Sequence, residues 1–558
     1  MRVVVGARET IAGAARRLRA HQASAAPVVA AGKPVGMLTR ALGENALRHG
    51  LGDERVADIA AGGAPRVSPS ADLRAMKKAS VGIAAGLVVG ASRGSLQGVV
   101  TRHRLEEAVR RHVPRFAPPG WLLGRDLGAR MHRTLGADHA GILRKAGGLA
   151  GAQGVGLYLA GGVVRDVLLG TPSKDIDLVV EGDGVMFAEE LGEILDARVT
   201  RHEMFGTAVI EPAGGGRIDV ASARRETYDT VSALPRVTPG TLLEDLLRRD
   251  VTINSMAIHL DGARYGRLTD ELGGERDLRA RLLRVNHSLS ITEDPTRAFR
   301  IARLAARLGF SPAGESIASL SLARDVRAFD ALSGERLFRE FSLIAAEPEP
   351  ALALRQIARM GLLEQMGTGL RFDAAAATSV GRLMEGLRAG VLPLEQSSSL
   401  AERSLLLLMV LSLRARQAQR EALAARLRIT GQAAERLVLS GVELPPLVRA
   451  LCSATRPSRI AKSIEESSPD LLALAWATGP ARARRAIEIY HRRLRAVSVN
   501  VTGEALLRMG LAPGREFAKV LGRLRQARLD GEVTDDAAES ALAASLVRRM
   551  SRRPRGRD

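Results

Sequence analysis

The chain has 558 residues, of which 46% are hydrophobic and 26% charged, and its formal net charge at pH 7 is +21. This length is too great for one hydrophobic core and predicts about three or four domains. The basic excess indicates an anionic partner, such as a nucleic acid or a membrane surface. The single cysteine, Cys452, excludes an intrachain disulfide framework and is typical of a reducing compartment, so we expect a cytoplasmic protein.

Of these two partners, the sequence favours a nucleic acid. The longest apolar run, residues 405–413, lies between Arg403 and Arg414 and is too short to span a bilayer. We expect this run to form a buried helix. The N-terminus has no basic stretch followed by an apolar one, so we expect neither a signal peptide nor a membrane partner.

Residues 1–111 contain an internal repeat. The segment APVVAAGKPVGMLTR (26–40) recurs loosely as AGLVVGASRGSLQGVVTR (85–102). Each segment predicts a β-hairpin, preceded by an amphipathic helix at 14–21 or 71–79 and followed by a second helix. This repeated unit of helix, strand, strand and helix resembles a tandem CBS pair, which is an α/β fold.

CBS pairs often bind adenosine nucleotides, through a hydroxyl residue after the second strand and an aspartate three positions later. Thr39 and Thr101 match the hydroxyl residue, but Leu42 and Arg104 stand where the aspartate is expected. We therefore favour a structural or RNA-supporting role for the repeat. Binding of an adenosine nucleotide and self-association are the alternatives.

Residues 112–135 are expected to form a linker. Proline and glycine gather in HVPRFAPPGW before a short helix begins. An amphipathic helix is then predicted over 137–149, and it leads into the most informative part of the sequence.

Residues 157–180, LYLAGGVVRDVLLGTPSKDIDLVV, combine a phosphate cradle with paired carboxylates. A predicted strand runs into Gly161 and Gly162, where a helix begins, so backbone N–H groups at a helix N-terminus offer an anion site. On the next predicted strand, Asp175 and Asp177 point to the same side, because side chains alternate along a strand. Two hard oxygen donors beside a phosphate cradle suit Mg²⁺ and a nucleoside triphosphate. For the two aspartates taken alone, a buried turn with solvated side chains is the alternative.

The same stretch resembles the signature of the class II tRNA nucleotidyltransferases and the bacterial poly(A) polymerases, a branch of the polymerase-β-like superfamily. The resemblance implies that Gly161, Gly162 and Arg165 cradle a triphosphate. It also implies that Asp175 and Asp177 bind two Mg²⁺ ions.

A third carboxylate follows on a predicted strand. The sequence predicts strands over 205–210 and 217–220, and the second of these carries Asp219. A third carboxylate on a neighbouring strand would complete a two-metal site for nucleotidyl transfer. The alternative is an ion pair between Asp219 and Arg224 or Arg225, and the sequence leaves both open.

The segment LLEDLLRRDVTINSMAIHL, residues 242–260, follows a predicted loop over 230–240. We expect a helix that ends near Arg249 and an extended segment from Val251. The segment resembles the family's second motif, RRDxTIN, in which planar guanidinium groups suit a triphosphate and the Asp and Asn suit a ribose hydroxyl. The alternative is that the basic pair complements a helix dipole. The resemblance implies nucleotide contacts for Arg248, Arg249, Asp250 and Asn254.

Residues 270–285, DELGGERDLRARLLRV, resemble the family's hinge between the catalytic head and a helical neck. Residues 291–310, ITEDPTRAFRIARLAARLGF, resemble its nucleotide-reading motif, EDxxR. Asp294 followed by Pro295 is also a common helix start, with the aspartate as N-cap. The residues matching the motif are Glu293, Asp294 and Arg297, and the resemblance implies further nucleotide contacts for Arg300 and Arg303.

The chemistry of the EDxxR motif is selective between bases. Cytosine and adenine both place an exocyclic amine beside a ring nitrogen that accepts a hydrogen bond. A carboxylate can accept from the amine while a guanidinium donates to the ring nitrogen, whereas uracil and guanine present a carbonyl and an N–H at these positions. Asp294 and Arg297 would thus select CTP and ATP without a template.

Residues 334–344, GERLFREFSLI, resemble the last shared motif, a neck helix. The rest of the chain is expected to be helical and to bind tRNA through scattered lysines and arginines. The basic residues within 552–557 are expected to form a solvated tail. Helix breaks are predicted at the prolines 348, 350, 445, 446, 457 and 480.

The predicted fold is multidomain, with an α/β CBS pair, a polymerase-β-like nucleotidyltransferase α+β head, and an all-α neck, body and tail. The resemblance implies template-independent addition of C and/or A from CTP or ATP to the 3′ end of tRNA, with pyrophosphate released by two-metal catalysis. The alternatives are an enzyme that adds only A or only CC, a poly(A) polymerase, and a catalytically silent RNA-binding protein. The expected boundaries are 1–111 for the CBS-like pair, 112–135 for the linker, 136–260 for the head, 261–345 for the neck and 346–558 for the body and tail.

Overall fold

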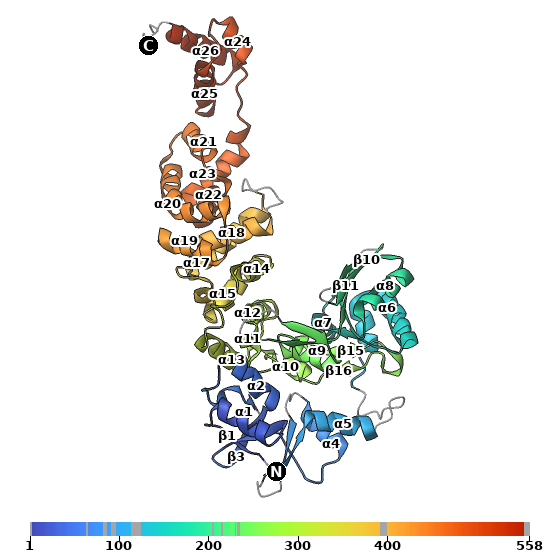
Figure 1. Ribbon diagram of the computed structural model, residues 1–558. Coiled ribbons are helices and arrows are strands. Elements are labelled where there is room, and N and C mark those ends of the chain that lie inside the picture. The colour runs from blue at the N-terminus through green and yellow to red at the C-terminus, as the bar shows by residue number, and fades with distance from the viewer. Residues whose placement is uncertain are drawn as a thin grey trace. The chain divides into compact units, whose positions relative to one another are not determined.

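The structure is a computed structural model, and its chain forms two compact units, Met1–Ser333 and Gly334–Asp558 (Figure 1). Residues 113–123 of the expected linker and the basic residues of 552–557 lie outside the described residues. So do parts of two expected segments, the strand over 205–210 and the hairpin over 85–102. The described residues are 3–62, 65–81, 86–90, 96–112, 124–173, 175–203, 206–213, 216–228, 230, 235–390 and 399–551.

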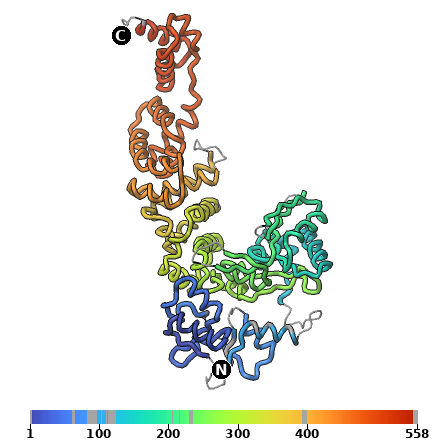
Figure 2. Tube along the Cα trace, viewed as in Figure 1, coloured from blue at the N-terminus to red at the C-terminus, as the bar shows by residue number. Residues whose placement is uncertain are grey.

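The N-terminal part of the first unit contains the same arrangement twice (blue in Figure 2). In each half a short strand pairs in parallel with the first strand of a β-hairpin, and helices precede and follow that hairpin. The repeat seen in the sequence therefore corresponds to two similar structural halves. The first half consists of β1 (Val5–Gly6), α1 (Ile11–Ala20), β2 (Ala25–Ala30), β3 (Lys33–Thr39) and α2 (Arg40–Arg48), followed by α3 (Val56–Ile59) and β4 (Ala61–Gly62). The second consists of β5 (Arg66–Val67), α4 (Leu73–Ser80), β6 (Gly86–Gly90), β7 (Leu96–Thr101) and α5 (Arg102–His112).

The head is built on a mixed seven-stranded sheet in the order β10-β11-β12-β9-β8-β15-β16. Strands β9 and β12 are parallel, and the other neighbouring pairs are antiparallel. The strands are β8 (Gly156–Ala160), β9 (Asp175–Glu181), β10 (Ala197–His202), β11 (Thr207–Pro212), β12 (Arg217–Ser222), β15 (Ala257–His259) and β16 (Leu268–Thr269).

The two faces of this sheet have different partners. On one face, alternate residues such as Leu178 of β9 and Val220 of β12 join an apolar core with three helices, α6 (Gly128–Gln153), α7 (Gly162–Leu169) and α8 (Gly184–Leu195). On the other face, Val179 of β9 packs in a cluster with Leu242 and Leu246 of α9 (Leu242–Leu247). Because side chains alternate, Asp177 and Asp219 belong to the α9 face.

Two local predictions in the head were wrong. The expected loop over 230–240 contains β14 (Arg236–Pro239), which pairs with β13 (Arg224–Thr227) in a two-stranded sheet. Pro239 lies at the end of its strand, where a missing N–H is tolerated. The segment after Val251 begins with a 3₁₀ turn, η2 (Thr252–Asn254), before β15, because Ser255 Oγ donates to Val251 O and turns the chain back.

The neck segment of the first unit is mainly helical, as expected, but it also contains two short strands that pair in parallel. The glycines of the hinge motif lie at the start of its first helix, where Gly273 has a φ of 76°. A left-handed residue of this kind favours glycine. The elements are α10 (Gly274–Ala280), β17 (Leu282–Leu283), α11 (Ser290–Glu293), α12 (Thr296–Leu308), β18 (Ser311–Pro312) and α13 (Gly314–Asp325).

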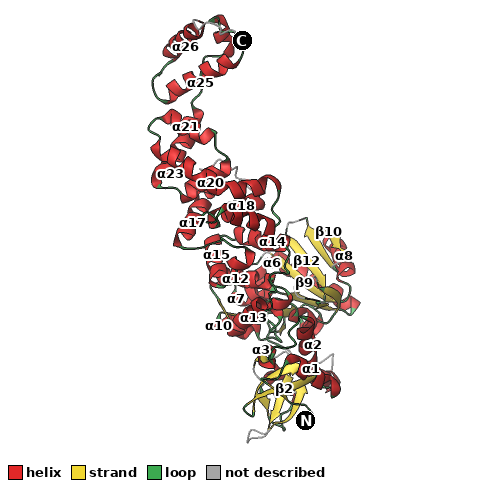
Figure 3. Ribbon diagram, turned by 60° about the vertical axis from the view of Figure 1, so that its left-hand side comes forward, coloured by secondary structure: helices red, strands yellow, loops and turns green. Residues whose placement is uncertain are grey.

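All the elements described in the second unit are helices (red in Figure 3). They are α14 (Gly334–Ala345), α15 (Pro350–Arg359), α16 (Leu363–Met366), α17 (Ala374–Arg388), α18 (Leu400–Leu411), α19 (Gln417–Arg426), α20 (Gly431–Ser453), α21 (Pro457–Glu465), α22 (Pro469–Thr478), α23 (Ala481–Arg492), η4 (Leu494–Ala496), α24 (Gly503–Arg508), α25 (Arg515–Leu529) and α26 (Asp536–Ser551).

The apolar run at 405–413 lies mostly within α18, where residues 405–411 are all buried, so the prediction of a buried helix was right. The predicted break at prolines 445 and 446 was wrong, because both lie inside α20. The flanking Leu444 and Leu447 are buried, and their packing stabilises the helix against the missing N–H groups.

Among the described helices, none is long and apolar enough to cross a membrane. The cytoplasmic location stays a prediction.

A close helix contact in the head gives a test of this fold. Gly147 of α6 is buried, and a Cβ there would lie 2.2 Å from Leu260 O, so Gly147→Ala should destabilise the protein by about 1–3 kcal/mol in urea unfolding. The neighbouring Gly148 is exposed with open space around it, so Gly148→Ala should be neutral or stabilising by up to about 1 kcal/mol. Equal effects of the two substitutions would contradict the contact.

Candidate active site

Two of the predicted carboxylates lie side by side on the α9 face of the head sheet. Asp177 of β9 and Asp219 of β12 are direct partners in the parallel ladder, so their side chains leave the sheet on the same face. Both are partly exposed. The backbone of Asp175 lies opposite Arg217 in the same ladder, while its side chain lies outside the part that the structure describes.

The ion-pair partner of Asp219 is not one of those weighed from the sequence. Arg217, two residues earlier on β12, donates to both carboxylate oxygens, with an Nη2–Oδ1 distance of 2.7 Å. Arg224 pairs with Glu226 instead, and Arg225 pairs with Glu244. The side chains of Arg217 and Asp219 are 61% and 42% exposed. Exposed pairs contribute little stability, so the Asp219 carboxylate can exchange this partner for another cation at small cost.

A turn at Gly161 brings the start of α7 close to these carboxylates. Gly161 has a φ of 89°, and a Cβ there would lie 2.7 Å from Arg249 Nη1 and 3.6 Å from Asp177 Oδ2. Glycine is required because a side chain would both strain the backbone and displace the guanidinium. The turn thus places the N-terminus of α7, an acid and an arginine around one point.

A second group of predicted residues forms a line of contacts next to this point. Arg165 is buried on α7, and its Nη1 donates to Asn254 Oδ1 at 2.9 Å. Asn254 Nδ2 donates in turn to Asp250 Oδ1 at 3.3 Å. Arg300 of α12 reaches the same carboxylate, with 4.0 Å between its Nε and Asp250 Oδ2. Residues from three separate sequence motifs therefore meet here.

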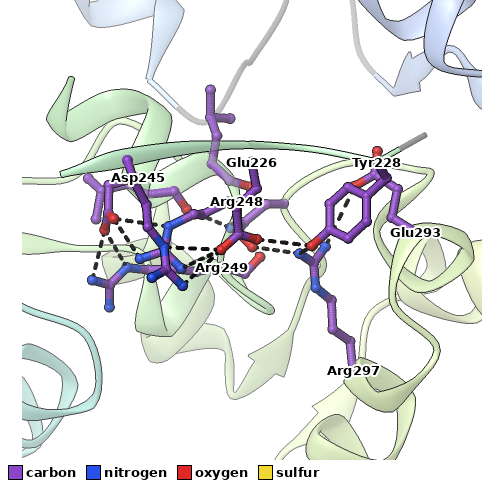
Figure 4. A network of polar contacts seen from close by, with 11 residues as sticks. Glu226, Tyr228, Asp245, Arg248, Arg249, Glu293 and Arg297 are labelled. Carbon is purple, nitrogen blue, oxygen red and sulfur yellow. Dashed lines mark hydrogen bonds and ion pairs between the residues drawn. The ribbon is translucent and has the colours of Figure 1, made fainter. Parts of the chain in front are cut away.

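The two arginines of the RRDxTIN motif are held by one buried acid, Asp245 (Figure 4). Arg248 Nη2 lies 2.6 Å from Asp245 Oδ1, and Arg249 Nη2 lies 2.9 Å from Asp245 Oδ2. The Asp245 side chain is fully buried, at 0% exposure. Burial alone would raise the pKa of this carboxyl, but the guanidinium groups of Arg249 and Arg248 outweigh it and hold the pKa below its usual value.

Asp245 was not among the residues predicted from the sequence. Its spacing of three and four residues before the arginine pair, on one helix, is the signal that would have found it.

The nucleotide-reading motif is largely interior. Arg297 is only 3% exposed, and its Nη2 donates to Arg248 O at 2.7 Å and to Tyr228 OH at 3.3 Å. Its Nη1 donates to Ser290 Oγ at 2.8 Å. By contrast, the Arg300 side chain is 51% exposed. The exposure of Arg303 is intermediate, so the three arginines of α12 with expected nucleotide contacts differ in environment.

Tyr228 and Glu226 were also missed, because β13 was not expected to face α12. Tyr228 OH donates to Glu226 Oε2 at 3.0 Å while it accepts from Arg297. Burial raises the pKa of Tyr228, so its side chain stays a neutral phenol that can donate one hydrogen bond and accept another.

The predicted helix start at Asp294 is shifted by one residue. Helix α12 begins at Thr296, and Pro295 occupies the capping position instead. Asp294 Oδ1 accepts from Thr296 N at 3.1 Å and from Thr296 Oγ1 at 2.7 Å.

The residues around Asp177 fit a divalent cation by chemistry. Asp177 and Asp219 offer carboxylate oxygens on one face of the sheet, the ligand type that Mg²⁺ prefers. Among the described side chains there is no cluster of three metal-binding groups, and that of Asp175 is not among them.

Comparisons with known proteins agree with this geometry. Residues 157–284 match the Poly A polymerase head domain. The chain is 31% identical over 555 residues to an A-adding tRNA nucleotidyltransferase of Geobacter sulfurreducens, which covers 96% of this chain. The structure of the present chain is similar to that of the Thermotoga maritima CCA-adding enzyme complexed with tRNA. The TM-score is 0.64 and the identity 25%, over 76% of this chain and 99% of the Thermotoga chain. The structure is also similar to a CCA-adding enzyme complexed with ATP, at a TM-score of 0.65 and 25% identity, over 78% and 99%.

These comparisons make the chain similar to members of the family of tRNA nucleotidyltransferases and poly(A) polymerases. It spans 63% of the length of its Geobacter relative. Divalent metal ions are general in nucleotidyltransferases of this family, which agrees with the oxygen ligands at Asp177 and Asp219.

Replacing Asp245 tests how strongly its buried carboxylate binds the two arginines. Asp245→Asn removes a buried counter-charge, so we expect the free energy of unfolding in urea at pH 7 to fall by about 3–5 kcal/mol. A carboxyl whose folded pKa lies below its ordinary 3.8 stabilises the fold above that pH, and this contribution is lost as the pH falls through the lower value. The variant should therefore lose less stability than the parent on acidification below about pH 4.

Asp330→Asn is the control for this prediction. Asp330 is exposed and pairs with the exposed Arg327, so the change should stay within about 0.5 kcal/mol. An Asp245→Asn variant as stable as the parent at pH 7 would show that the buried pair contributes nothing.

Proposed function

We propose that the protein is a template-independent nucleotidyltransferase that adds C and/or A from CTP or ATP to the 3′ end of tRNA, with addition of A as its specific activity. The observation that carries the proposal is the meeting of Asp177, Arg249 and the N-terminus of α7 at Gly161, with Asp219 on the next strand. This arrangement combines a triphosphate cradle with acids for a metal. Addition of A is favoured because the A-adding Geobacter relative matches 96% of the chain.

The cradle residues act on the triphosphate. In this proposal the backbone at Gly161 and Gly162 and the guanidinium of Arg249 bind phosphate oxygens. Arg165 supports the turn through its hydrogen bond to Asn254. Arg248, turned toward Glu226 and Asp245, keeps Arg249 aligned rather than touching the phosphates itself.

The carboxylates serve the reacting hydroxyl. Asp175, Asp177 and Asp219 would hold Mg²⁺, and bound Mg²⁺ lowers the pKa of the tRNA 3′-hydroxyl and neutralises charge on the departing pyrophosphate. Asp177 and Asp219 would fix the place of the metal in this proposal, because they are direct partners on neighbouring strands.

Sugar and base would be read on the neck side. Asp250 and Asn254, already hydrogen-bonded to one another, face a ribose hydroxyl in this proposal. Asp294 and Arg297 read the base, with Arg300 and Arg303 as further contacts. For Arg297 this requires that one of its present acceptors be exchanged for the base, because both Nη atoms donate within the protein.

The remaining parts would hold the RNA. We propose that the helices of 346–558 bind the tRNA body and that the N-terminal repeat, the expected CBS pair, has a supporting role. Thr39 Oγ1 already accepts from Leu42 N as the cap of α2, which favours a structural role for this hydroxyl. Binding of an adenosine nucleotide there would give heat on titration with AMP, and self-association would appear in light scattering.

The proposal is tested with purified protein, Mg²⁺ and labelled ATP or CTP, on tRNAs that end before CCA, at C, or at CC. We expect one A to be added to the tRNA ending in CC. Addition of C to the shorter tRNAs would show a CC-adding or CCA-adding enzyme, long tails would show a poly(A) polymerase, and no incorporation at all would refute the transferase.

The double substitution Asp175→Asn and Asp177→Asn should lower incorporation by at least about a thousandfold while tRNA binding by filter retention is kept. Asp196→Asn is the control, because Asp196 is exposed at the end of α8 in a left-handed conformation that asparagine tolerates. Unchanged incorporation in the double variant would remove the acids from the mechanism.

A further inference from the structure

The first half of the N-terminal repeat shares its apolar core with the segment that leads into the nucleotide-reading motif. Leu289, between β17 and α11, and Leu322 of α13 are buried in the same cluster as Ile11 of α1 and Ile59 of α3. Ser288 Oγ donates to Ile59 O at 2.7 Å. The chain just before Glu293 is therefore anchored to the repeat by both packing and a hydrogen bond.

A polar contact extends this interface into the motif itself. Asn45 of α2 donates from Nδ2 to Glu293 Oε1. Arg48 Nη2 donates to Asn45 Oδ1 at 3.2 Å. Because a guanidinium group can only donate, the contact of Arg48 with Asn45 Oδ1 orients the Asn45 amide so that its NH₂ group faces the Glu293 carboxylate.

Glu293 is the link between this amide and the reading residues. Its side chain is 8% exposed, so the carboxylate depends on partners inside the protein. Its other oxygen, Oε2, lies 3.4 Å from His287 Nε2 and 3.9 Å from Arg297 Nη1. Asp294 follows directly in the chain.

Arg297 connects these contacts to the head, because its guanidinium group donates to Tyr228 OH and Arg248 O (Figure 4). A continuous path of contacts thus runs from α2 through Glu293 and Arg297 to the end of α9. The same residues, Asn45, Glu293 and Arg297, line a cavity of about 1010 Å³ between the repeat, β13 and the neck.

We infer that Asn45 is a positioning residue for nucleotide choice: by holding the Glu293 carboxylate against Arg297, the N-terminal repeat helps to set the geometry with which Asp294 and Arg297 read the base. This inference rests on the proposed nucleotidyl transfer. The physical reason is that a buried carboxylate which loses its donor must shift or admit water, and Arg297 then loses its aligned counter-charge.

A second polar anchor of the repeat provides a matched control. Lys77 of α4 donates to Glu271 Oε1 at 2.7 Å, and Arg102 of α5 contacts the same carboxylate. This contact joins the second half of the repeat to the hinge motif and does not touch Glu293. Lys77→Ala weakens the attachment of the repeat while leaving the path from Asn45 to Arg297 intact.

The experiment measures kcat and KM for ATP and for CTP separately on tRNA ending in CC, for the parent, Asn45→Ala, Asn45→Asp and Lys77→Ala. We expect Asn45→Ala to lower the preference for ATP over CTP by about tenfold, mainly through KM for ATP. Asn45→Asp places a second carboxylate against Glu293 and should lower the preference further. Lys77→Ala should leave the preference unchanged.

A double-variant cycle separates positioning from simple loss of packing. Asn45→Asp combined with Glu293→Gln exchanges donor and acceptor across the contact, so the pair should lose less preference than the sum of the single changes. Thermal unfolding of each variant shows whether the fold is kept.

The outcomes separate this inference from the proposed function. A parent protein that incorporates no nucleotide refutes the proposed function, and this inference with it. An active parent whose preference is unchanged in folded Asn45→Ala, or changed equally by Lys77→Ala, refutes only the inference. Strict additivity in the cycle also contradicts it.

Discussion

The buried carboxylate of Asp245 holds the centre of the candidate site together. It binds the guanidinium groups of Arg248 and Arg249 from within one helix, and the carbonyl of Arg248 is in turn the acceptor for Arg297 of α12. The residues proposed to bind the triphosphate and those proposed to read the base are therefore connected through a single charged group with no exposure to water. Such a group stabilises the fold only while its partners stay in place, which makes the arrangement rigid.

The head sheet supplies the second constraint. The parallel pairing of β9 with β12 sets Asp177 beside Asp219, and the apolar core on the opposite face fixes both strands. The acids occupy the face that carries α9, so the helix with Asp245 and the carboxylates share one side of the sheet. A site built on regular elements in this way holds its groups more precisely than one built on loops.

Much of this was predictable from local patterns. The strand, glycine pair, helix and strand around Gly161 follow from periodicity and from glycine at a tight turn, and the motifs identified the family. The partner of Asp219 was predictable but was missed, because Arg217 lies two residues earlier on the strand predicted over 217–220 and therefore shares its face. The burial of Arg297 was hidden, since its acceptors at Tyr228, Ser290 and Arg248 come from segments that only the tertiary fold brings together. Strand β14 was missed because Pro235, directly before it, and Pro239, its last residue, suggested a loop.

In the proposed mechanism, one site between α7, α9 and α12 binds triphosphate, sugar and base. The most direct measurement is a crystal structure of the protein with Mg²⁺ and a non-hydrolysable ATP analogue. We expect phosphate oxygens within hydrogen-bond distance of Arg249 and of the backbone at Gly162, metal bound by Asp177, and the adenine edge against Asp294. An analogue bound elsewhere, such as in the N-terminal repeat with these residues untouched, would contradict it.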